Sequence, residues 1–143
     1  MTKTWYEILH WCSKGKTKQE RVARLQKNGG AALKQILGYT FDPNIKWLLP
    51  EGEPPYNPVA DSAEIEGQFQ AELRRLYLFV EGPTDTQQNL KPQRREHLYI
   101  ELLESIHPDD AKLLASMKDG KLPFKGITKN VVAEAFPNLT KNW

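Results

Sequence analysis

Apolar residues in this chain recur mostly at intervals of three and four positions, a spacing that places their side chains on one face of an α-helix. Stretches in which apolar and polar residues alternate, as in half-buried strands, are scarce. A chain of 143 residues also has room for a hydrophobic core of its own. We therefore expect an all-α protein, a compact single-domain bundle of six to eight short helices with a proline-rich extended connector.

Residues that favour helix starts divide the chain into segments. Two capping boxes, Thr17 with Glu20 and Asp61 with Glu64, would each satisfy two backbone amides at a helix N-terminus. The second box precedes an amphipathic stretch whose last part, LYLFV, is apolar on every side. We expect this stretch to be helical, with a strand as the alternative for LYLFV. We also expect Leu78 to contact either a second layer of the domain or another protein.

Prolines dominate the segment that follows the first helices. Asp42 and Pro43 predict one or two helical turns through Leu49, but the sequence PEGEPPYNP at 50–58 excludes a regular helix or a central strand. We expect an extended, polyproline-like connector, here called the strap, that crosses the surface of its own domain. A peptide-recognition segment with Tyr56 as a contact residue is the alternative. The expected organisation of the single domain over 1–143 is basic N-terminal helices at 4–38, the strap at 50–60 and C-terminal helices at 62–137.

The formal net charge of +2 conceals two segments of opposite charge. Residues 1–34 carry a net charge of +6, and residues 51–85 carry a net charge of −6. Such a separation steers a charged partner to one end of the molecule if it persists in the fold. If the two segments meet in the fold, they neutralise each other instead. The sequence leaves both arrangements open.

Two groups of basic residues are candidates for nucleic-acid binding, because phosphates attract cations and neighbouring aromatic rings can stack on bases. The N-terminal group, here called the basic face, consists of Lys14, Lys18, Arg21, Arg24 and Lys27. The C-terminal group consists of Lys121, Lys125 and Lys129. Neither group contains a P-loop, and the basic face suits sequence-tolerant binding rather than base readout. We expect replacement of Lys18, Arg21 and Arg24 by glutamine to leave thermal stability nearly unchanged, because surface substitutions usually change it by less than about 0.5 kcal/mol.

Residues suited to catalysis or metal binding are sparse, with three histidines and one cysteine in the chain. Two Glu-x-x-His spacings occur, but one lies on a polar helix face and the other ends before a proline, so we expect no metal site. We assign no catalytic residue and no cofactor. The enzymatic alternative is a metal-dependent nuclease that uses Glu72, Glu101 or Asp109 with a divalent ion. Cys12 shares a helix face with apolar residues and is expected to be a buried structural thiol.

The location in the cell is inferred from what the sequence lacks. No apolar run approaches the roughly 18 residues of a membrane span, and a lone cysteine cannot form an internal disulfide. We therefore expect a cytosolic protein without a membrane anchor.

Three segments carry a resemblance to known proteins. The sequences FDPNIKWLLPEGEPPYNP (41–58), LYLFVEG (76–82) and KGITKNVVAEAFP (125–137) resemble a small, functionally uncharacterised family of T4-like tailed phages, cyanophages included. The resemblance spans most of the chain and implies a viral source and the cytoplasm of an infected bacterial cell. It transfers no functional residue.

These observations favour a non-enzymatic phage accessory protein that binds a protein partner, either a host factor or a component of the viral replication or expression machinery. The alternative is a sequence-tolerant nucleic-acid-binding protein that uses the basic face. A metal-dependent nuclease is the third and least favoured interpretation.

Overall fold

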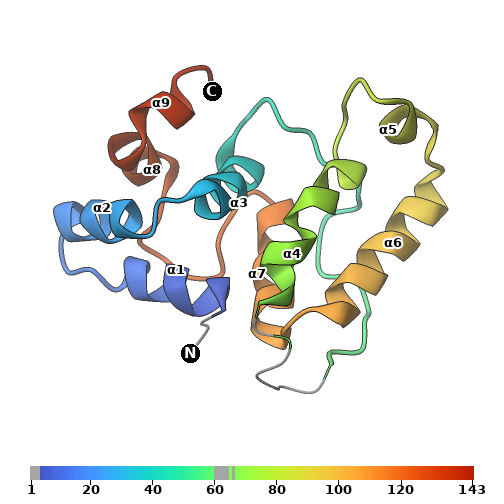
Figure 1. Ribbon diagram of the computed structural model, residues 1–143, viewed down its shortest axis with the longest axis horizontal. Coiled ribbons are helices and arrows are strands. Elements are labelled where there is room, and N and C mark those ends of the chain that lie inside the picture. Colours follow the sequence, from blue (N-terminus) through green and yellow to red (C-terminus); the bar gives the residue numbers. More distant parts are fainter. Residues whose placement is uncertain (1–3, 60–64, 66) are drawn as a thin grey trace.

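Three helices in succession, α1, α2 and α3, open the fold, and a central helix, α7, separates them from the helices on the opposite side (Figure 1). The computed structural model describes residues 4–59, 65 and 67–143. Within these residues there are nine α-helices, one 3₁₀ helix and no strand. The helices are α1 (Trp5–Ser13), α2 (Lys18–Lys27), α3 (Ala31–Phe41), α4 (Gln68–Glu72), the 3₁₀ helix η2 (Leu73–Phe79), α5 (Asp85–Asn89), α6 (Pro92–Ser105), α7 (Pro108–Lys118), α8 (Lys129–Ala135) and α9 (Pro137–Thr140). The predicted all-α single-domain bundle is confirmed.

Several helices begin where capping residues predict. The Thr17 hydroxyl accepts a hydrogen bond from the backbone amide of Glu20 at 3.1 Å, and the Glu20 carboxylate accepts one from the amide of Lys16 at 2.8 Å. Pro92 and Pro108 occupy the first turns of α6 and α7. The other predicted capping box, Asp61 with Glu64, lies outside the described residues.

The structure departs from the sequence expectations between the strap and α6. The helix predicted from Pro43 to Leu49 is wrong, because the backbone there pairs with a distant segment: the Leu48 amide donates to the Phe79 carbonyl at 2.8 Å. Trp47 and Val80 form an isolated antiparallel bridge. The LYLFV stretch is accordingly a 3₁₀ helix that ends in extended backbone at Val80.

A short helix forms in a segment whose sequence is typical of a polar loop. At the start of α5, Thr84 and Gln87 form a reciprocal capping box. The short helices α5 and α9 raise the number of helices among the described residues above the expected six to eight.

The core is built around α7, which packs against α1, α3 and α6. Its buried side chains include two charged residues, Asp110 and Lys118. Asp110 accepts a hydrogen bond from the Tyr6 amide at 2.9 Å, and this bond ties α7 to the first turn of α1. Lys118 points to the strap, at the other end of α7.

A buried arginine fixes the segment around LYLFV. The Arg95 guanidinium donates to the Leu78 carbonyl at 2.9 Å and to the Gln87 carbonyl at 2.7 Å. The Gln87 side-chain amide in turn donates to the carbonyl of Tyr77 at 3.0 Å. These bonds satisfy carbonyls that neither helix can satisfy within itself, and they hold η2 and α5 against α6.

Candidate functional site

The strap lies across α6 and α7 and is held by three side-chain contacts. The Lys118 ammonium donates to the Pro50 carbonyl at 2.7 Å. The Gly52 amide donates to the Asp119 carboxylate at 3.3 Å, and the Asn57 amide donates to the Glu104 carboxylate at 2.8 Å. Residues 50–59 are therefore extended but attached to their own domain, while residue 60 lies outside the described part.

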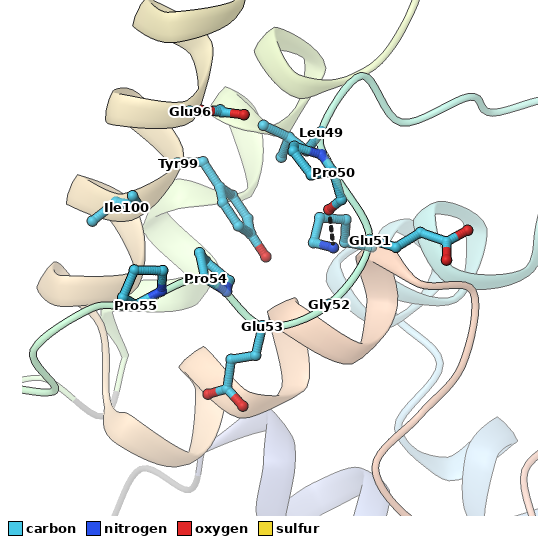
Figure 2. A pocket seen from close by; sticks show the side chains of 11 residues that line it. Leu49, Pro50, Glu51, Gly52, Glu53, Pro54, Pro55, Glu96, Tyr99 and Ile100 are labelled. Carbon is cyan, nitrogen blue, oxygen red and sulfur yellow. Dashed lines mark hydrogen bonds between the residues drawn. The ribbon is translucent and has the colours of Figure 1, made fainter.

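A cavity of about 350 Å³ opens between the strap and α6 (Figure 2). Its walls are mostly apolar, and Figure 2 shows that they come from the strap on one side and from α6 on the other. The apolar lining consists of Leu49, Pro50, Pro54, Pro55 and Ile100. We call this cavity the strap pocket.

Tyr99 supplies a polar group inside the strap pocket. The residue is only 2% exposed, and its ring makes an edge-to-face contact with Phe79 at a centroid distance of 5.5 Å. Its hydroxyl points into the pocket (Figure 2) and has no hydrogen-bond partner among the described residues. Burial raises the pKa of Tyr99 well above its usual range, and nearby negative charges raise it further. The phenol is therefore neutral at physiological pH.

Lys118 brings a positive charge to the pocket wall, but this charge is paired. The ammonium lies 2.7 Å from the Asp119 carboxylate and the same distance from the Pro50 carbonyl. A buried ammonium requires such partners, because desolvation strongly disfavours an isolated charge. Lys118 therefore anchors the strap.

The mouth of the strap pocket is acidic. Glu51, Glu53 and Glu96 line it, and all three are exposed. Burial raises the pKa of the neighbouring Tyr56 to about 12, and a hydrogen bond and the charge of Glu53 contribute to the shift. Among the charged residues that line the pocket itself, Lys118 is paired with Asp119 and the others are negative.

The two residues predicted to contact a protein partner are both half-buried. Tyr56 and Leu78 pack against the hydrophobic core. The exposed aromatic residue of the LYLFV stretch is instead Tyr77, at 40% exposure. Contact of Tyr56 and Leu78 with a partner stays a prediction, and their packing against the core gives both residues a structural role in the fold.

Three residues of the basic face bind groups of their own domain. Lys18 forms an ion pair with Glu134 at 2.8 Å. Arg21 donates to the Gly15 carbonyl at 3.0 Å, and Arg24 donates to the Trp11 carbonyl at 2.7 Å. These contacts change the expectation for the triple glutamine variant, since two of the substitutions would leave backbone carbonyls without their donors. Lys14 and Lys27 are exposed.

The structure brings the two basic groups together. Gly126, in the loop that carries the C-terminal group, packs so closely on α1 and α2 that a Cβ atom there would lie 2.8 Å from the Ser13 carbonyl oxygen and 3.2 Å from the Arg21 side chain. Lys121, Lys125 and Lys129 are all exposed around this loop. Phe124 is not free to stack on a base, because its ring packs against the rings of Tyr6 and His10.

The basic and acidic segments lie apart. No ion pair in the described part of the chain joins residues 1–34 to residues 51–85. Figure 1 places α2 and α6, the helix that the strap crosses, at opposite ends of the longest axis. Among the described residues, the two segments therefore do not neutralise each other through ion pairs.

The residues considered for a nuclease reaction do not assemble into one site. Glu72 accepts hydrogen bonds from Gln68 and Arg75 in its own segment, and Glu101 pairs with His97 at 2.9 Å. Within the described ranges, no group of three or more His, Cys, Asp or Glu side chains is arranged to hold a metal ion. In the second Glu-x-x-His pair, the Glu104 carboxylate accepts the hydrogen bond from the Asn57 amide of the strap.

Cys12 is fully buried, as predicted. Burial raises the pKa of its thiol to about 11, so the thiol stays protonated. A protonated, buried thiol is a poor nucleophile and packs as a small apolar group.

The sequence does not predict the strap pocket. Its periodicity places Tyr99 in the core and assigns no role to Lys118. The signal that the sequence does carry is indirect: a strap that crosses its own domain requires a face on which to lie and polar groups to hold its carbonyls.

The model of one protein family, a family of unknown function termed DUF6433, matches residues 8–123. The chain belongs to this family. No curated protein and no solved structure matches it. Among the helices of the described residues, none is both long and apolar enough to cross a membrane.

Proposed function

We propose that this chain is a non-enzymatic accessory protein of a T4-like phage that acts by binding a partner protein in the cytoplasm of the infected cell. The partner is a host factor or a component of the viral replication or expression machinery. The viral source rests on the resemblance of residues 41–58, 76–82 and 125–137 to a phage family. The binding function rests on the strap pocket.

The size and lining of the strap pocket support a protein partner. Ligand pockets usually measure about 300–1,000 Å³, and the strap pocket, at about 350 Å³, is at the lower end of this range. It has space for one large side chain. Its largely apolar wall suits an anchor residue, the kind of side chain that dominates the energy of many protein interfaces.

The charge distribution supports the same proposal. The acidic mouth faces solvent, since Glu51, Glu53 and Glu96 are all exposed. Complementary charge speeds association and selects partners more than it adds affinity. A partner with a positive surface would approach the pocket and be repelled by the basic face.

Affinity purification from infected cells, with and without nuclease treatment, tests the proposal. Ile100→Trp would fill the strap pocket from α6, and Glu101→Trp on the same helix, outside the pocket, is the matched control. We expect the wild type and the control to capture the same protein and Ile100→Trp to lose it. Equal capture by both variants, or a partner that disappears on nuclease treatment, would overturn the assignment of binding to the pocket.

A second candidate function, sequence-tolerant nucleic-acid binding, is supported by the surroundings of Trp11. This indole is 43% exposed, with the Arg24 guanidinium 4.5 Å and the Lys27 ammonium 5.8 Å from the ring centroid. An exposed ring beside cations is suited to stacking on a base and neutralising a phosphate. Binding would fall with rising salt, and Lys14→Gln with Lys27→Gln would lower the salt slope by about one unit for each phosphate that is no longer neutralised. Retention of the wild-type slope by the double variant would contradict this function.

A further inference from the structure

We propose that the strap pocket takes the long cationic side chain of a lysine or arginine from the partner protein, and that the Tyr99 hydroxyl accepts a hydrogen bond from that cation. This inference rests on the proposed function and names the chemistry of the occupant. It is carried by the position of the hydroxyl, by the charges around it and by the form of the pocket wall.

The Tyr99 hydroxyl is a buried polar group directed into a cavity. Only 2% of Tyr99 is exposed, and within the described residues its oxygen has no hydrogen-bond partner. Buried polar atoms in folded proteins almost always have a partner. Leaving one unpaired disfavours the fold, because the group has lost its hydrogen bonds to water without replacing them. An occupant with an N–H group at its tip would supply the missing partner.

The charges that act on this hydroxyl select a cation over an anion. Asp119 and Glu53 are the carboxylates whose fields raise the pKa of Tyr99, and because Asp119 is paired with Lys118, Glu53 is the one that leaves a net negative charge near the hydroxyl. The Lys118 ammonium is already paired with Asp119 and bonded to the Pro50 carbonyl. A neutral phenol oxygen in a negative field accepts a hydrogen bond from an ammonium or guanidinium. A carboxylate or phosphate would be repelled at the same place.

The wall of the strap pocket matches the stem of such a side chain. Leu49, Pro54 and Ile100 contribute apolar surface to the same pocket that Tyr99 lines. Lysine and arginine carry three or four methylene groups that pack against apolar surface while the charged end reaches polar groups. A leucine or phenylalanine would contact the same wall but leave the Tyr99 hydroxyl unpaired. The combination of apolar wall and polar end therefore distinguishes the cationic side chains.

Binding of single capped amino acids to the full-length protein tests the inference. The probes are the N-acetyl amides of lysine, arginine and norleucine, and norleucine is the neutral control because it has a similar stem without the cation. NMR titration at tens of millimolar probe would follow the Ile100 methyl groups and the Gly52 amide, which border the pocket. We expect a cationic probe to shift these signals and norleucine to bind about tenfold more weakly. The lysine and arginine arms identify the preferred cation.

Variants separate the role of the hydroxyl from that of the pocket as a whole. Tyr99→Phe keeps the ring and should weaken the cationic probes by about fivefold to tenfold while leaving norleucine unchanged. Glu53→Gln should weaken only the cations, and Glu101→Gln, an exposed glutamate of α6 outside the pocket, should change nothing. Thermal unfolding provides the control for folding, and Tyr99→Phe should unfold at or above the wild-type temperature because it removes an unpaired buried group.

The outcomes distinguish this inference from the proposed function. Equal affinity for norleucine and the cations, unchanged cation binding by Tyr99→Phe, or no shift with any probe would overturn a cationic occupant. The first two results would leave protein binding through the strap pocket intact, with an apolar anchor in place of a cation. Failure of the proposed function would instead be seen as unchanged partner capture by Ile100→Trp, a measurement independent of these probes.

Discussion

Replacement of Asp110 by asparagine should remove a pH dependence of stability that the wild-type fold carries. Asp110 is fully buried in α7, and one of its carboxylate oxygens accepts the bond from the Tyr6 amide. The other oxygen has no hydrogen-bond partner among the described residues. Burial raises the pKa of this carboxyl from 3.8 to about 6, and the nearby charges of Asp109 and Glu7 add to the shift while the Tyr6 amide and His107 oppose it.

The sign and size of the effect follow from this shift. Because the folded-state pKa is raised, the folded state holds a proton that the unfolded chain has released, so the contribution of Asp110 to stability is highest below about pH 4 and falls as the pH rises through about 6. A shift of about two pKa units corresponds to about 3 kcal/mol between the two limits. Asparagine keeps the oxygen that accepts from the Tyr6 amide and does not titrate. We therefore compare the free energy of unfolding of the variant with that of the wild type at each pH. From about pH 4 to about pH 8, this difference should change by about 3 kcal/mol in favour of the variant.

Urea unfolding followed by tryptophan fluorescence, at a series of pH values on both proteins, measures this difference. Other titrating groups are shared by the two proteins, so the difference isolates Asp110 and its coupling to His107. Asp110→Ala is the control for the hydrogen bond, because it also removes the acceptor of the Tyr6 amide and should be less stable than Asp110→Asn at every pH. A difference between Asp110→Asn and wild type that stays constant with pH would refute the raised pKa of Asp110.

Three further substitutions test how the fold is held together. Arg95→Met should lower the free energy of unfolding by about 3 kcal/mol in chemical denaturation, because it leaves the buried Gln87 carbonyl and the partly buried Leu78 carbonyl without a charged donor. A decrease below about 1 kcal/mol would show that Arg95 does not hold η2 and α5 against α6. Gly126→Ala should lower the free energy of unfolding by about 1–3 kcal/mol in the same assay, since the φ of +110° disfavours a side chain and a Cβ would press on the Ser13 carbonyl. Wild-type stability of this variant would show that the loop can move away. Lys118→Met should release the strap at Pro50 and speed its cleavage by a protease at a site within residues 50–58. A cleavage rate equal to that of the wild type would show that the contacts of Asp119 and Glu104 are enough to hold the strap.

Short stretches of the sequence determine where several of the helices begin. Thr17 and Glu20 satisfy backbone amides within one turn, and the prolines at 92 and 108 fit only the first turn of a helix. The strap is extended because its prolines cannot join a helix. These features depend on contacts between residues that are neighbours in the chain, so the sequence determines them without reference to the rest of the fold.

The segment from Leu73 to Val80 illustrates where such reasoning fails. Its spacing favours an α-helix, but the Leu48 amide bonds to the Phe79 carbonyl, and Arg95 and Gln87 bond to other carbonyls of the segment. These partners lie outside the segment, and they stabilise a 3₁₀ helix that ends in extended backbone. Pairing with a distant segment also replaced the helix predicted from Pro43.

Charges can be assigned from the sequence by type, but their roles were decided by the tertiary structure. Arg21 and Arg24 bind backbone carbonyls, while Lys14 and Lys27 remain exposed, a division that helical periodicity does not reveal. The strap pocket is the clearest case, because Tyr99 comes from α6, Lys118 from α7 and most of the remaining wall from the strap. Sequence alone determined where several helices begin and that the strap is extended, since local backbone preferences act over a few residues. Only the packing of distant segments placed a buried hydroxyl in a cavity with an acidic mouth.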